Sequence, residues 1–143
     1  MGTDAAGAPQ VHPPRVLVVD DESTIRIALR RFFTRMGWRV EEAANGESAL
    51  AMLILDARQD EIPRYALVVS DLRMPGINGI ELYDRLKATQ PWILRRLIFS
   101  TGDIVSEEAA AFVRSTDCVV LQKPFELATL RATIERVLAE ADG

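Results

Sequence analysis

From Arg15 onward, short apolar runs alternate with stretches of helical periodicity. The runs are rich in β-branched residues and predict five strands, at residues 15–19, 38–42, 66–70, 96–100 and 118–121. The first, third and fourth runs are almost continuously apolar, as in strands that are covered on both faces. The second run alternates apolar and polar residues, which suits the edge of a sheet.

The segments between these runs predict five helices. The first opens at Glu22–Ser23, ends at Gly37 and places on one face Ile25, Leu29, Phe32 and Met36. The second helix is expected around residues 49–53 and the third from Asn78 to Ala88. The fourth should follow Asp103 and continue through 109–111, and the fifth should begin after Pro124. The residues of this fifth helix that should face the core are Leu127, Leu130, Ile134, Val137 and Leu138. Strands that alternate with helices predict an α/β fold, a doubly wound parallel sheet in a three-layer sandwich.

Composition limits the class of protein. The 143 residues, 48% of them apolar, suit one domain at 15–140, with a flexible leader at 1–14 and a short tail at 141–143. A net charge of -4 argues against direct nucleic-acid binding and favours protein or small-ion partners. No apolar stretch is long enough for membrane insertion. The single cysteine, Cys118, cannot form an intramolecular disulfide, so a cytoplasmic location is expected.

Polar residues with chemical potential follow four of the predicted strands. They are Asp20 and Asp21, Asp71, Thr101 with Gly102, and Lys123. Because the carboxyl ends of parallel strands share one edge of the sheet, these side chains should meet there. Three crowded carboxylates repel one another and call for a divalent cation, and an all-oxygen ligand set favours Mg²⁺.

Charge balance suggests what else the site holds. Mg²⁺ and Lys123 together offset the three carboxylates, and the same cations suit a phosphoryl group esterified to Asp71. A carboxylate is an established phosphoryl acceptor. Each motif alone has an ordinary explanation, since Asp20 and Asp21 can cap a helix, Asp71 can belong to a turn and Lys123 can be a solvated charge. Their joint placement on the strand ends favours a common site.

The motifs that carry a family resemblance are Asp20-Asp21, Asp71-Leu72-Arg73-Met74-Pro75-Gly76 with Gly79, Thr101-Gly102-Asp103 and Lys123-Pro124-Phe125. Together they resemble the receiver domain of two-component response regulators, either stand-alone or attached to hybrid kinases. The resemblance implies the flavodoxin-like strand order 2-1-3-4-5. It also implies that Asp71 accepts a phosphoryl group from a phosphohistidine on a sensor kinase or a histidine phosphotransfer protein.

Further roles follow from the same resemblance. Asp20, Asp21, Asp71 and the backbone carbonyl of Arg73 would hold Mg²⁺, with Asp20 acting largely through water. Lys123 and Thr101 would contact the phosphoryl oxygens, and the Lys123–Pro124 bond would be cis. Arg73 and Asp103 would overhang the site, and we hypothesise that they slow hydrolysis of the acyl phosphate. The arginine-rich face of the first helix would dock kinases, and a homodimer is open.

One position departs from the family. Many members carry Tyr or Phe three residues before the lysine, whereas this chain has Val120. The output surface is therefore expected to work without that aromatic side chain.

Two other functions compete with that of a phosphorylation-controlled switch. One is a flavodoxin-like enzyme, which the absence of a Gly-rich phosphate loop disfavours. The other is a pseudo-receiver that acts as an unphosphorylated interaction module, which the presence of Asp21, Asp71, Thr101 and Lys123 disfavours. The expected activity is limited to self-phosphorylation and self-dephosphorylation, with no independent substrate turned over.

Overall fold

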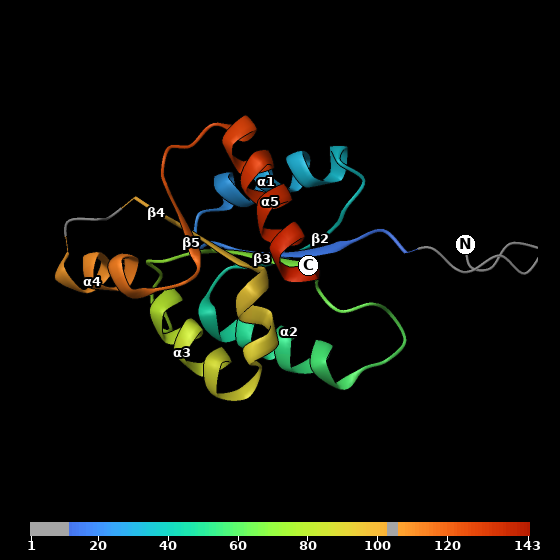
Figure 1. Ribbon diagram of the computed structural model, residues 1–143, viewed down its shortest axis with the longest axis horizontal. Helices are drawn as coiled ribbons and strands as arrows, with labels where there is room; N and C mark the ends of the chain where they lie inside the picture. The colour runs from blue at the N-terminus through green and yellow to red at the C-terminus, as the bar shows by residue number, and fades with distance from the viewer. Residues whose placement is uncertain (1–11, 103–105) are drawn as a thin grey trace, which may run out of the picture.

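A computed structural model describes residues 12–102 and 106–143 (Figure 1). Within them the chain forms one sheet of five strands, namely β1 (Arg15–Val19), β2 (Arg39–Ala43), β3 (Leu67–Asp71), β4 (Leu97–Thr101) and β5 (Val119–Gln122). The strand order is β2-β1-β3-β4-β5, and all neighbouring strands are parallel. This confirms the predicted fold class and places β2 at an edge.

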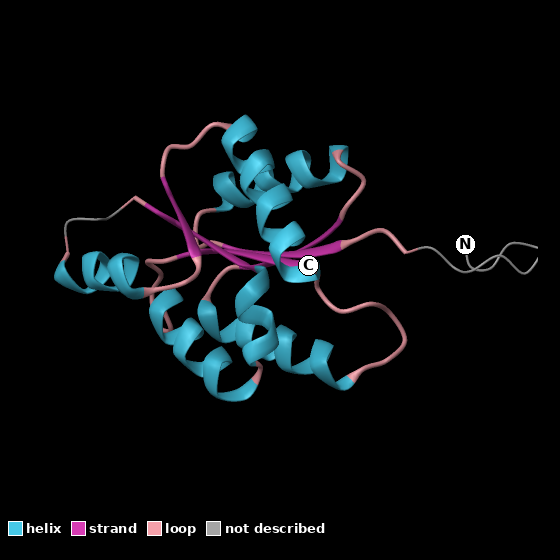
Figure 2. Ribbon diagram, in the orientation of Figure 1, coloured by secondary structure: helices cyan, strands magenta, loops and turns pink. Residues whose placement is uncertain are grey.

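The described residues also form five α-helices and one 3₁₀-helix, of which α5 follows the last strand. They are α1 (Ser23–Arg35), α2 (Gly46–Arg58), α3 (Gly79–Thr89), η1 (Pro91–Arg96), α4 (Glu107–Ser115) and α5 (Leu127–Asp142). Figures 1 and 2 show α1 and α5 on one side of the sheet and α2 and α3 on the other. No helix in the described residues has the length and apolar character needed to cross a membrane.

Side-chain alternation in β1 explains the two cores. Val16 and Val18 pack with α1 and α5, whereas Leu17 and Val19 pack with α2, α3 and α4. Strands β1, β3 and β4 are buried along their whole length. Strand β2 is partly exposed, as its alternating sequence predicts for an edge strand.

The structure differs from the sequence predictions in detail. Strands β2 to β5 each start one residue later than predicted, and η1 was not predicted. In α1 the buried positions are Leu29 and Phe33, while Phe32 is only partly buried. Leu127 is 51% exposed instead of facing inward, because it begins α5 and lies beside α1 at the rim of a groove. Helix α5 also runs two residues past the expected domain end at Glu140.

Close packing at two glycines sets the start of the helices near the site. A Cβ atom on Gly79 would lie 2.8 Å from the carbonyl oxygen of Asp71, so only glycine allows α3 to begin against the end of β3. A Cβ atom on Gly46 would lie 2.1 Å from the carbonyl oxygen of Ile77. The loop between β3 and α3 is therefore held against α2.

Candidate functional site

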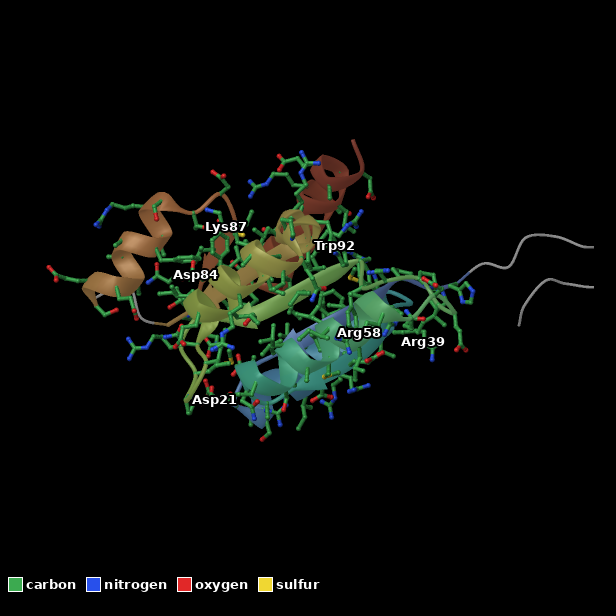
Figure 3. All side chains as sticks on the ribbon, turned by 90° about the horizontal axis from the view of Figure 1, so that it is seen from below. Asp21, Arg39, Arg58, Asp84, Lys87 and Trp92 are labelled. Carbon is green, nitrogen blue, oxygen red and sulfur yellow. The ribbon has the colours of Figure 1, made fainter. Side chains whose placement is uncertain are left out.

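The residues predicted for the site meet at the carboxyl edge of the sheet. Asp20 and Asp21 follow β1, while Asp71 and Thr101 end β3 and β4. One carboxylate oxygen from each of Asp20, Asp21 and Asp71 lies within 4.8 Å of the others. Asp20 and Asp71 are buried and Asp21 is exposed, so the cluster opens to solvent at one point. In Figure 3 Asp21 lies to the left of Arg39, which starts β2 on the right of the view.

Asp20 is held on all its polar atoms. Its Oδ1 accepts a hydrogen bond of 2.9 Å from the amide of Glu22, and its Oδ2 accepts one of 2.9 Å from Lys123. Its backbone N–H donates to the carbonyl of Ala43 at 3.1 Å, and its own carbonyl accepts from the guanidinium of Arg26 at 2.7 Å. The first carboxylate of the cluster is therefore fixed before any ligand binds.

Lys123 is the cation of the site. Its Nζ lies 2.9 Å from Asp20, 3.4 Å from Asp71 and 3.8 Å from Glu22. Burial lowers the pKa of Lys123, but the hydrogen bond to Asp20 and the charge of Asp71 outweigh burial and raise its pKa overall. The ammonium group therefore stays charged at neutral pH. The Lys123–Pro124 peptide bond is cis, as the family resemblance implied.

Asp71 is a carboxylate under electrostatic strain. Burial raises its pKa, Lys123 lowers it and the charge of Asp20 raises it again, with a net upward shift. The backbone N–H of Arg73 donates to its Oδ1 at 3.4 Å. A divalent cation among the three carboxylates would relieve this strain, and oxygen ligands at an edge open to water suit Mg²⁺. The cluster therefore fits the predicted ion.

Thr101 and Gly102 form the wall next to Lys123. Thr101 is fully buried, and its carbonyl accepts a 2.7 Å hydrogen bond from the backbone N–H of Lys123. A Cβ atom added to Gly102 would meet no described atom within 4 Å. The hydroxyl of Thr101 suits an oxyanion beside Asp71.

The loop after Asp71 carries the remaining predicted residues. The guanidinium of Arg73 reaches the hydroxyl of Ser106 at 3.5 Å and so spans towards α4. The predicted partner Asp103 lies outside the described residues. The role of the Arg73 carbonyl as a metal ligand stays a prediction.

Sequence reasoning missed two residues near the site. Glu22 was assigned only to the start of α1, yet its carboxylate lies 3.8 Å from the ammonium of Lys123. Arg26 belongs to the arginine-rich face of the first helix, for which kinase docking was the expected role, yet it bonds the carbonyl of Asp20. Their nearness in sequence to the Asp20–Asp21 pair was the only available signal.

Comparison with known proteins gives consistent matches. Residues 16–135 match the response regulator receiver domain family. The chain is 36% identical over 126 residues to response regulator MprA of Mycolicibacterium vanbaalenii, a match that covers 88% of this chain and 51% of that protein. For response regulator MprA of Mycobacterium avium the identity is 36% over 133 residues, a match that covers 90% of this chain and 54% of that protein. The chain thus spans about half the length of these curated relatives.

Two solved structures with similar folds share at least a quarter of the aligned residues. A CheY-like response regulator receiver domain protein from Methanospirillum hungatei matches with a TM-score of 0.76 and 25% identity, covering 92% of this chain and 98% of that one. Chemotaxis protein CheY4 of Vibrio cholerae matches with a TM-score of 0.70 and 28% identity, covering 88% and 99%.

Proposed function

The chain belongs to the response regulator receiver domain family of two-component signal transduction, and from this premise we propose that residues 15–140 form a switch phosphorylated on Asp71. The family consists of signalling switches rather than classical enzymes, and it binds Mg²⁺ at an acidic pocket. The observation that carries the proposal is the cluster of Asp20, Asp21 and Asp71 with the ammonium of Lys123 inside it.

The proposed donor is a phosphohistidine on a sensor kinase or a histidine phosphotransfer protein. A carboxylate oxygen of Asp71 attacks the phosphorus atom, the P–N bond breaks, and its electron pair stays on the histidine nitrogen, which takes a proton. The product is an acyl phosphate, which water later hydrolyses to restore the Asp71 carboxylate. The protein's own share of the reaction is positioning and charge stabilisation.

Each site residue has a proposed part. Asp21, Asp71 and the carbonyl of Arg73 would hold Mg²⁺, with Asp20 acting largely through water, and the ion would supply positive charge opposite the phosphoryl oxygens. Lys123 contacts one of these oxygens. Its ammonium already lies beside the Asp71 carboxylate, so it can move from that carboxylate to the phosphoryl group on the same side chain. The hydroxyl of Thr101 donates to another.

The phosphodonor is proposed to dock on the groove between α1 and α5. Arg31, Arg35 and Arg131 line this groove of about 590 Å³, together with Phe32, Met36 and Leu127. A groove lined by three arginines and by apolar side chains suits an acidic, amphipathic helix. The groove adjoins the cleft formed by Ile25, Lys123 and Phe125, so a donor seated there is close to the site.

The output surface is proposed to be the face of α4 and β5. Val120 lines a hollow of about 330 Å³ together with Thr101 and Val113, where a larger side chain would leave less space. A shift of Thr101 towards the phosphoryl group would reshape this hollow and change which partner binds. The proposed location is the cytoplasm, in keeping with the single cysteine.

Acetyl phosphate provides a direct test, because it supplies a phosphoryl group without a partner protein. Intact-mass spectrometry should show one added phosphoryl group on the wild type with Mg²⁺ and none with EDTA. Asp71→Asn should gain nothing, whereas Asp84→Asn, the same change at an exposed aspartate of α3, should behave like the wild type. Folded wild-type protein that binds Mg²⁺ but gains no group, even from a phosphorylated histidine donor, would favour the pseudo-receiver alternative.

A further inference from the structure

We propose that Arg26 is a positioning residue for the Mg²⁺ site, an inference that rests on the function proposed above. Its Nη1 donates a 2.7 Å hydrogen bond to the carbonyl oxygen of Asp20, and its Nε donates to Oε1 of Glu42 at 3.1 Å. The side chains of Arg26 and Glu42 are only 18% and 26% exposed. The guanidinium therefore joins α1, the end of β1 and the edge strand β2.

The bonded carbonyl belongs to the peptide group between the two aspartates. Asp20 itself is already fixed, since its carboxylate is held by Glu22 and Lys123 and its N–H by β2. Within residues 12–102 and 106–143, no hydrogen bond or ion pair holds the carboxylate of Asp21. The point from which the Asp21 side chain starts depends on the orientation of this peptide plane, and among the described residues Arg26 is the side chain that bonds the carbonyl of that plane.

Arginine suits this task because its guanidinium is flat and donates in several directions at fixed angles. The two bonds of Arg26 run from Nη1 and from Nε, so Glu42 locks the group in the orientation that reaches Asp20. A lysine at this position has a single ammonium group at the end of a flexible side chain. It cannot make the bonds to Asp20 and to Glu42 with the same rigidity. Arg26 thus stabilises, from outside the metal-binding residues, the backbone that carries Asp21, whose own carboxylate has no hydrogen-bond partner among the described residues.

Positioning and simple electrostatics predict opposite results when Arg26 is removed. If Arg26 acted only as a nearby positive charge, it would repel Mg²⁺, and its loss would tighten metal binding. If it positions Asp21, its loss weakens binding although a positive charge has been removed. Loss of an outer-shell partner typically weakens metal binding about 10–100-fold.

Arg30 supplies a matched control. It donates through its Nε to Oε2 of the same Glu42, and it is 47% exposed. The variant Arg30→Ala removes a positive charge from the same helix and a bond to the same carboxylate, but it leaves the bond between Arg26 and Asp20 in place. It should therefore change Mg²⁺ affinity by less than about twofold.

The experiment is a calorimetric titration of the full 143-residue chain with MgCl₂ at fixed ionic strength. We expect Arg26→Ala to raise the Kd for Mg²⁺ about tenfold and Arg26→Lys to raise it several-fold. In both variants, high MgCl₂ should restore the rate of phosphorylation by acetyl phosphate. Urea unfolding in EDTA checks that each variant is folded, and Arg26→Lys keeps the test open if Arg26→Ala does not fold.

The outcomes separate two kinds of failure. If the wild type binds Mg²⁺ and the folded Arg26 variants bind it equally well or more tightly, the positioning role is wrong and the proposed function stands. An equal loss in Arg30→Ala would also overturn it, because the effect would then come from the bonds to Glu42 that both arginines make and not from the bond between Arg26 and Asp20. If the wild type itself binds no Mg²⁺, the proposed function fails first.

Discussion

Nζ of Lys123 lies 2.9 Å from Oδ2 of Asp20, although the two residues are 103 positions apart in the chain. The same ammonium lies 3.4 Å from Asp71. Lys123 thus ties the end of β5 to the ends of β1 and β3 and balances two buried carboxylates. The contacts of Lys123 therefore also stabilise the carboxyl ends of β1, β3 and β5 against one another.

Removal of this ammonium should destabilise the protein when Mg²⁺ is absent. In Lys123→Met, Asp20 and Asp71 stay buried without their shared cation, so we expect a loss of about 2 kcal/mol in the free energy of unfolding. MgCl₂ should recover part of this loss because the ion replaces the missing charge. Urea unfolding with and without MgCl₂ measures both effects, and Lys87→Met, at an exposed lysine of α3, is the control.

Replacement of the proposed phosphoacceptor should stabilise the protein. The pKa of Asp71 is raised by burial and by Asp20, so its charged form costs stability at neutral pH. In EDTA, Asp71→Asn should therefore unfold at a higher urea concentration than the wild type. We expect its free energy of unfolding to be larger by about 1 kcal/mol.

The pH dependence gives the sign of this effect. Because the pKa of Asp71 is higher in the folded state than the ordinary value of 3.8, the cost of its charge is present at neutral pH. The cost disappears as the pH falls to and below the ordinary value, where both states bind the proton. The advantage of Asp71→Asn should shrink over that range, and an unchanged advantage would show that charge is not its source.

Local sequence patterns predicted where the side chains of the site meet, because the end of an apolar run marks the end of a strand. Asp20, Asp71 and Lys123 all follow such runs, and parallel topology then brings them together. Contacts between side chains from distant elements were not predictable in this way. The bond from Arg26 to Asp20 depends on how α1 leaves β1, and the exposure of Leu127 depends on where α5 starts relative to α1.

Gly79 and Gly102 should respond in opposite ways to the same substitution. In Gly79→Ala the new Cβ would lie 2.8 Å from backbone atoms of Asp71 and Leu72, which cannot move without shifting the site. We expect a loss of about 2 kcal/mol or more, although alanine is otherwise the better helix former. Gly102→Ala meets no described atom and should change stability by less than about 0.5 kcal/mol. Urea unfolding compares the two, and equal losses would contradict the packing argument.

A buried polar network holds the opposite edge of the sheet. Arg15 donates to Asp56 at 2.7 Å, to the carbonyl of Pro63 at 2.8 Å and to Glu41 at 2.8 Å. Arg15 and Asp56 are 6% and 5% exposed. Asp56→Ala leaves a buried guanidinium without its closest partner and should cost about 3 kcal/mol of stability. Asp60→Ala, in the exposed loop that follows α2, should cost less than about 0.5 kcal/mol.

Tyr65 should make this network sensitive to alkaline pH. Burial and the 2.5 Å hydrogen bond that its hydroxyl donates to Glu41 raise the pKa of Tyr65 well above its ordinary value of 10.0. A raised pKa in the folded state contributes stability that is complete below pH 10 and is lost as the pH rises above that value, since only the unfolded chain releases the proton. Between pH 9 and pH 11 the wild type should therefore lose about 1 kcal/mol more than Tyr65→Phe, as measured by urea unfolding. Tyr83→Phe, at the chain's other tyrosine, should follow the wild type, and a parallel decline in all three proteins would contradict this account.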